Sequence, residues 1–250
     1  MFRRFATCTA LTAALLAPVA GCGGDSSPAA KPSPTPQPAE VLAAAATRTA
    51  GINLKLEMID GGDAKATKVN GSYDTTKRLT LLAGTEDGET MQLVVGPEKA
   101  YLSGLNALEG KTFRIDLAKL PSGNGMVVFA EPMFPLLLLP TATTVTLTAP
   151  GSFSGTLDLT RVQAASIGAR KFVEGASTAA AAKANALPFT ATVNAQGYLA
   201  TITVTFPAWG DEHKDARIDT SYSGYGDPVT VAEPTGAAVL DAPDGMYTAD

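Results

Sequence analysis

Apolar and polar side chains alternate along most of this chain, with the period of a half-buried β-strand. In the first such run, Leu54, Leu56 and Met58 are separated by charged residues. Glycine and proline punctuate the runs that follow, as they do between the strands of a meander. The alternation continues to residue 117, returns at residue 144, and ends with Val229 and Val231. Counted together, the runs predict about ten or eleven antiparallel strands.

Short helices are predicted where the alternation is interrupted. Residues 40–49 are rich in alanine, and Gly51 follows them as a stop signal. In the middle of the chain, residues 131–140 read EPMFPLLLLP, which indicates a short buried helix with proline near its start. A second alanine-rich helix is expected over residues 177–186. The chain is therefore predicted to be α+β, with far more strand than helix.

This imbalance limits how the sheet can be covered. Each alternating strand has one apolar face that must be buried, and a few short helices cover only part of a long sheet. A long antiparallel sheet curls or closes. It then forms either a barrel with a filled interior or a curved half-barrel with an apolar groove. The inward side chains are mainly aliphatic, which suits alkyl chains but equally fills an ordinary core, so both forms remain open at this point.

The N-terminal segment carries the pattern of a bacterial lipoprotein signal. Arg3 and Arg4 make a basic start, residues 6–18 are mostly apolar, and Val-Ala-Gly leads to Cys22. This sequence resembles a lipobox, in which the cysteine thiol receives a diacylglyceryl group and a peptidase cuts before it. Residues 1–21 are thus expected to be removed as a signal peptide, leaving Cys22 lipidated. The alternative is an ordinary secretory signal in which Cys22 lies near the cut by chance.

The segment that begins at this cysteine is predicted to be a tether. Residues 22–39 contain alternate prolines, which favour polyproline II and an extension of about 3.1 Å per residue. A diacylglyceryl cysteine supplies the two acyl chains that stable membrane attachment needs. The protein is therefore expected to be lipid-anchored on the extracytoplasmic face of the cell membrane, with residues 40–250 as a single domain.

Charge and cysteine content narrow the partners and sites. The chain has a formal net charge of −5, and the expected cut removes Arg3 and Arg4 but no acid. An acidic chain without a basic run has no general attraction for nucleic acid, so no nucleic-acid partner is expected. Cys8 would leave with the signal peptide and Cys22 would be lipidated, which leaves neither a disulfide nor a cysteine metal site.

Groups suited to catalysis are sparse. His213, the only histidine, lies in the charged run GDEHKD, which is typical of a solvated loop. Without a second histidine or a free cysteine, zinc-type sites and Cys/His nucleophiles are excluded, and the chain has neither a G-x-S-x-G elbow nor a P-loop. No catalytic residue, metal or cofactor is predicted. Two carboxylate pairs lie beside glycines and fit surface turns better than a catalytic site: Asp211 with Asp215, and Glu86 with Asp87.

The C-terminal stretch carries a more specific pattern. Residues 221–243 read SYSGYGDPVTVAEPTGAAVLDAP, in which an aromatic-Gly-acid-Pro turn precedes a Val-Thr-Val strand and a later proline. This resembles the closing segment of the actinobacterial LppX/LprG lipoprotein family (LppX_LprAFG). The order of lipobox, Pro-rich tether, Ala-rich helix, meander and returning strands is also similar to that of the family. The matching positions are Tyr225, Gly226, Asp227, Pro228, Val229, Thr230, Val231 and Pro234.

The resemblance implies a LolA/LolB-like fold, a strongly curved antiparallel half-barrel with a few short helices on its concave side around an apolar cavity. Mycobacterial members of the family bind acylated lipids or glycolipids and help to carry them through the cell envelope. The implied partners are such a lipid, the plasma membrane through the Cys22 anchor, and an envelope transporter. Residues 131–140 depart from the family pattern through their additional prolines, which affects the wall or lid that they build.

The leading hypothesis is thus a non-enzymatic, membrane-tethered lipoprotein that binds acylated lipid or glycolipid in an apolar cavity and carries it within the envelope. The alternatives are a structural or interaction lipoprotein with a filled core, and a hydrolase that uses a carboxylate pair. Residues of the mid-chain helix are expected on one cavity wall and residues of the first meander on the other. They are Met133, Phe134, Leu137 and Leu138 on the first wall, and Leu54, Leu56, Met58, Leu93 and Val95 on the second.

Overall fold

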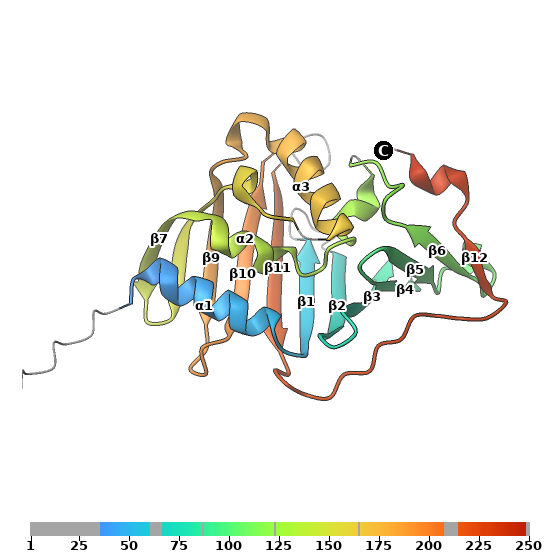
Figure 1. Cartoon of the computed structure of the whole chain (residues 1–250), viewed down its shortest axis with the longest axis horizontal. Coiled ribbons are helices and arrows are strands. Elements are labelled where there is room, and N and C mark those ends of the chain that lie inside the picture. The colour runs from blue at the N-terminus through green and yellow to red at the C-terminus, as the bar shows by residue number, and fades with distance from the viewer. Residues whose placement is uncertain are drawn as a thin grey trace, which may run out of the picture. The chain divides into compact units, whose positions relative to one another are not determined.

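Twelve strands lie side by side in one sheet, in the order β12-β6-β5-β4-β3-β2-β1-β11-β10-β9-β8-β7 (Figure 1). The bounds of the strands are β1 (Leu54–Asp60), β2 (Thr67–Asp74), β3 (Leu79–Glu86), β4 (Glu89–Val95), β5 (Lys99–Ser103), β6 (Thr112–Asp116), β7 (Ala142–Ala149), β8 (Ser152–Leu157), β9 (Leu187–Val193), β10 (Leu199–Phe206), β11 (Ala216–Ser223) and β12 (Val239–Asp241).

This computed structural model describes most of the chain after the predicted tether, and Pro36–Asp250 forms one compact unit. The predicted signal peptide, the lipidation site Cys22 and most of the tether lie outside the described residues, as do His213, Asp87 and Asp211. The described ranges are 36–60, 67–86, 88–122, 124–164, 166–207 and 215–248.

The sheet consists of two antiparallel meanders that join in its middle. Strands β1 to β6 follow one another in space, as do β7 to β11, and β1 pairs with β11 in the antiparallel direction. The short β12 pairs with β6 in the parallel direction. Because β7 and β12 lie at the two ends of the order, the sheet is open. The α+β class is confirmed, and the sheet has more strands than the about ten or eleven that the alternation predicts.

The last predicted strand is wrong in position. Residues 229–231 are irregular, and β12 forms instead at Val239–Asp241. Prolines flank the irregular segment, and a proline has no N–H to donate to a ladder. Val231 is still only 2% exposed, because it packs on the face of the sheet opposite the main core. Its neighbours there are Leu79, Val94 and Tyr101.

Three α-helices form in the described part of the chain, and Figure 1 shows them on the same face of the sheet. Helix α1 (Pro38–Ala50) begins where the Gln37 N–H donates to Glu40 Oε2 at 3.0 Å, and it ends where the Gly51 N–H donates to the carbonyl of Thr47. Helix α2 (Phe134–Leu138) has Pro135 in its first turn and continues as a 3-10 helix over Leu139–Thr141. Both helices confirm the sequence predictions.

Helix α3 (Ile167–Ala180) corrects the third helix prediction, because it begins ten residues before 177–186. The Ser166 Oγ accepts a hydrogen bond from the Ala169 N–H and so caps the helix at this earlier start. The start of the helix also packs closely against the backbone of Ala130, since a Cβ atom on Gly168 would lie 2.0 Å from the Ala130 carbonyl oxygen. The cap and this close contact outweigh the helix propensity of the alanines that follow.

Shorter 3-10 helices complete the described connections. Their bounds are η1 (Asn106–Leu108), η2 (Gly125–Val128), η3 (Leu139–Thr141), η4 (Leu159–Arg161), η5 (Ala181–Lys183) and η7 (Asp244–Tyr247).

The main core lies between the helices and the sheet. At its centre, the rings of Phe134 on α2 and Phe172 on α3 stack with their centroids 4.3 Å apart. The ring of Phe206 on β10 meets each of them edge-on at 5.8 Å. Each of these rings is at most 1% exposed, so α2, α3 and the second meander share one packed aromatic cluster.

Candidate functional site

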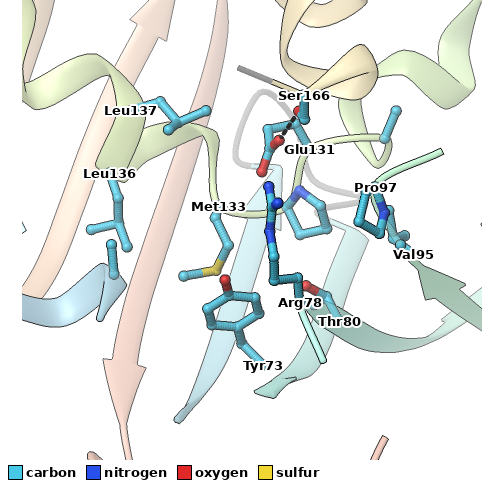
Figure 2. Close-up of a pocket in the computed structure, with 14 residues that line it drawn as sticks. Tyr73, Arg78, Thr80, Val95, Pro97, Glu131, Met133, Leu136, Leu137 and Ser166 are labelled. Carbon is cyan, nitrogen blue, oxygen red and sulfur yellow. Dashed lines mark hydrogen bonds between the residues drawn. The ribbon is translucent and has the colours of Figure 1, made fainter. Parts of the chain in front are cut away.

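In the described part of the chain, a pocket of about 160 Å³ lies beside α2 (Figure 2). It lies between the end of α1, the start of α2 and strands β2 to β4. Both apolar and polar side chains line it. They are Ala50, Tyr73, Arg78, Thr80, Val95, Gly96, Pro97, Ala130, Glu131, Pro132, Met133, Leu136, Leu137 and Ser166.

The strand register builds one side of this pocket. Tyr73 on β2 pairs with Thr80 on β3, and Thr80 pairs with Val95 on β4. Residues that lie opposite each other across antiparallel strands point to the same face of the sheet. These side chains therefore form a row that reaches the pocket, with phenol and hydroxyl groups beside an aliphatic side chain.

Helix α2 builds the other side. Met133, Leu136 and Leu137 face the pocket from the start and middle of this short helix (Figure 2). The helix begins at Phe134, and the Leu136 N–H donates to the Met133 carbonyl at 3.0 Å. Leu137 is partly exposed, whereas Leu136 is buried, so α2 forms both a pocket wall and part of the core.

Glu131 places a carboxylate at the edge of this apolar wall. Its Oε2 accepts a hydrogen bond from the Ser166 hydroxyl at 2.6 Å, and Ser166 in turn caps α3. Burial raises the pKa of Glu131, while the hydrogen bonds from Ser166 and the Met133 N–H and the charge of Arg78 act in the opposite direction. The pKa is raised overall, so burial outweighs these contacts. Glu131 thus connects the starts of α2 and α3.

Arg78 supplies the positive charge of the site. It follows the turn after β2, where the Lys77 N–H donates to Asp74 Oδ1, and its backbone has a φ of 56°. This left-handed conformation is unfavourable for a residue with a long side chain. Figure 2 shows the side chain extending toward Glu131, with Tyr73 and Met133 beside it. Arg78 is an exposed residue, and the structure gives its guanidinium neither a hydrogen bond nor a close ion pair with a described residue.

The predicted cavity residues divide between this pocket and the core behind it. Val95, Met133 and Leu137 line the pocket. The other predicted residues are buried in the main hydrophobic core: Leu54, Leu56, Met58, Leu93, Phe134 and Leu138. The two predicted walls therefore lie on the same side of the sheet and contribute to one continuous apolar interior.

The polar residues of the pocket were missed at the sequence level. Arg78 looks like an ordinary turn residue in TTKRL, and Glu131 looks like the polar start of an apolar helix. Ser166 gives the only usable signal, since serine before a helical segment favours an N-cap. No pattern in the sequence connects these residues, because they come from three separate elements of the fold.

The size of the pocket limits what it can hold as it stands. Pockets for small molecules usually measure about 300–1,000 Å³, and this one measures about 160 Å³. The neighbouring interior is filled by side chains such as Leu54 and Leu138, both 0% exposed. An acyl chain longer than a few carbons would therefore have to displace part of α2.

Comparison with known proteins adds no identification, since no protein family model and no curated protein sequence matches the chain. Among the described residues, no helix has the length and apolar character needed to cross a membrane. That part of the chain also holds no group of three or more His, Cys, Asp or Glu side chains placed to bind a metal ion.

Proposed function

We propose that this protein is a membrane-anchored lipoprotein that binds acylated lipid or glycolipid in an apolar cavity and carries it within the cell envelope. In this proposal the open sheet is a strongly curved half-barrel, with the helices on its concave side, as in the family that the C-terminal segment resembles. The observation that carries the proposal is the amphipathic pocket at the edge of α2, where polar groups at the surface lie beside aliphatic side chains that continue into the core.

The short helix α2 is the element best suited to move. It has five residues between Met133 and Leu139, and its side chains meet the rest of the core mainly through apolar contacts. An inserted alkyl chain would replace such contacts with similar ones, at about 0.8 kcal/mol per buried methylene. The cost of displacing the helix is then offset by the chain that takes its place.

The polar groups at the pocket mouth fit the head of such a lipid. Arg78 and Tyr73 offer a cation and a phenol beside the apolar wall of Met133 and Leu137 (Figure 2). A lipid whose chain enters under α2 would leave its polar head at these groups. The anchor supports the same proposal from the sequence, because a lipidated Cys22 and its tether would keep the pocket close to a membrane that holds the cargo.

Uptake of a fluorescent acyl probe by the purified protein tests this proposal. Leu137→Trp fills the pocket, so the variant should bind the probe more weakly than the wild type. Leu147→Trp places the same side chain on β7, where Leu147 is 52% exposed, and should bind like the wild type. Equal binding by both variants would show that the probe does not enter at α2, and no binding by the wild type would contradict the proposal.

The filled-core alternative has one observation in its favour, which is the small pocket volume of about 160 Å³. A structural or interaction lipoprotein would need no larger cavity than this. The same uptake experiment separates the two functions, because a protein whose core never opens takes up no acyl probe.

A further inference from the structure

Two hydroxyl groups on β11 are buried in the main core without a partner. Thr220 is 2% exposed and Tyr222 is 5% exposed. In the described structure, neither the Thr220 Oγ1 atom nor the Tyr222 Oη atom has a hydrogen-bond partner. Such atoms are rare in folded proteins, because an unpaired hydroxyl in an apolar core is destabilising.

Both side chains point into the interior from the middle of the sheet. Along β11 buried and more exposed residues alternate, and Thr220 and Tyr222 are on the buried side. Thr220 lies between Met58 on β1 and Ile202 on β10, and Tyr222 lies opposite Leu56 on β1. Valine and phenylalanine would fill these positions with nearly the same shape and without an unpaired oxygen.

The sheet register connects these hydroxyls to the pocket. Leu56 pairs with Tyr222 on one side and with Gly71 on the other, and Gly71 is two residues from the pocket residue Tyr73 along β2. With strands about 4.8 Å apart and about 3.4 Å per residue, the Cα atoms of Tyr73 and Tyr222 are roughly 12 Å apart. At Gly71 on this path, the atoms nearest to an added Cβ would be aliphatic carbons of Leu56 and Leu82, at 2.9 Å.

The chemistry of the two groups indicates what they would bind. A hydroxyl can donate one hydrogen bond, and burial raises the pKa of Tyr222, so its phenol keeps the proton. A carbonyl oxygen has two lone pairs and can accept from both groups. An alkyl chain alone offers nothing to either hydroxyl.

We propose that Thr220 and Tyr222 form an internal binding site for the ester carbonyl oxygen of the acyl lipid, which enters below α2 with its chain. This inference rests on the proposed function and deepens it, since it names the acyl carbonyl as a group that the protein recognises inside the core. The lipid head lies at the pocket mouth near Arg78, and the carbonyl lies deeper, beside β11. The bound oxygen gives a partner to hydroxyls that have none in the packed core.

Two fluorescent probes with the same chain length test this site in the purified protein, one a fatty-acid ester and the other a hydrocarbon without oxygen. Thr220→Val and Tyr222→Phe should each weaken binding of the ester probe by roughly tenfold and leave binding of the hydrocarbon probe unchanged. Both variants should also melt at a higher temperature than the wild type in the absence of probe. Ser221→Ala, on the opposite face of β11, is the control and should change neither probe.

Each other outcome contradicts the inference. If both probes weaken equally, the variants act through packing and not through a carbonyl contact. If the unliganded variants melt at a lower temperature, the hydroxyls already have partners such as buried water. A wild type that binds both probes with equal affinity refutes this site alone, whereas a wild type that binds neither probe also refutes the proposed function.

Discussion

Truncation of Phe172 is the sharpest test of how the helices are held on the sheet. This ring is 1% exposed and contacts Phe134 on α2 and Phe206 on β10. Phe172→Ala removes a large buried side chain, which costs about 3–5 kcal/mol in comparable cores. A domain has only about 5–15 kcal/mol of stability, so the loss is a large part of the total. The melting temperature should fall by roughly 6–20 °C, at about 2–4 °C per kcal/mol.

Urea denaturation followed by far-UV circular dichroism measures this change in the free energy of unfolding. Glu174→Ala on the same helix is the matched control, because Glu174 is exposed and alanine favours the helix. It should alter stability by less than about 0.5 kcal/mol. A loss of less than about 1 kcal/mol for Phe172→Ala would refute the packing of α2 and α3 around this ring.

Three further predictions concern other parts of the protein. The pKa of Glu131 is raised in the folded protein, so its contribution to stability is full below its unfolded pKa and is lost as pH rises through the folded value. In Glu131→Gln this part of the pH dependence should disappear when the free energy of unfolding is measured at several pH values. A difference between variant and wild type that stays constant with pH would contradict this. Gly168→Ala should lower the free energy of unfolding by about 1–3 kcal/mol in the same urea assay, since its Cβ would lie 2.0 Å from the Ala130 carbonyl oxygen. An unchanged midpoint would show that the start of α3 does not pack against Ala130. Cys22→Ala should abolish labelling by a palmitate analogue, and labelling that persists would overturn the lipobox prediction.

Elements fixed by local chemistry could be predicted from the sequence. The period of two in Leu54, Leu56 and Met58 indicates β1, and the structure buries these residues on one face. Gly51 ends α1 as its position predicts. The prolines of residues 131–140 limit α2 to a short helix, which confirms the prediction for this segment.

The errors arise where contacts distant in sequence decide the structure. Propensity favours a helix over the alanines of 177–186, but the hydrogen bond of Ser166 to Glu131 and the contact of Gly168 with Ala130 place the start of α3 earlier. Alternation favours a strand at residues 229–231, but Lys77 Nζ donates to the Val231 carbonyl at 2.6 Å and the segment crosses the sheet instead. Local patterns carry no information about such contacts.

The candidate site was only partly predictable for the same reason. The apolar residues Val95, Met133 and Leu137 follow from hydrophobic patterns and do line the pocket. The polar residues Arg78 and Glu131 line the same pocket only because the turn after β2 folds close to the start of α2. Their residue types are ordinary for a turn and a helix start, so nothing in the sequence sets them apart.

Analysis of what the protein holds when purified tests the central proposal most directly. The protein would be purified from its own cells, extracted with organic solvent, and the extract examined by mass spectrometry with a matched extract of Leu137→Trp as control. The lipid-carrier account predicts an acylated lipid in the wild-type extract, in an amount comparable to the protein, and much less in the variant. An extract without lipid, from a protein that also takes up no acyl probe, would contradict it.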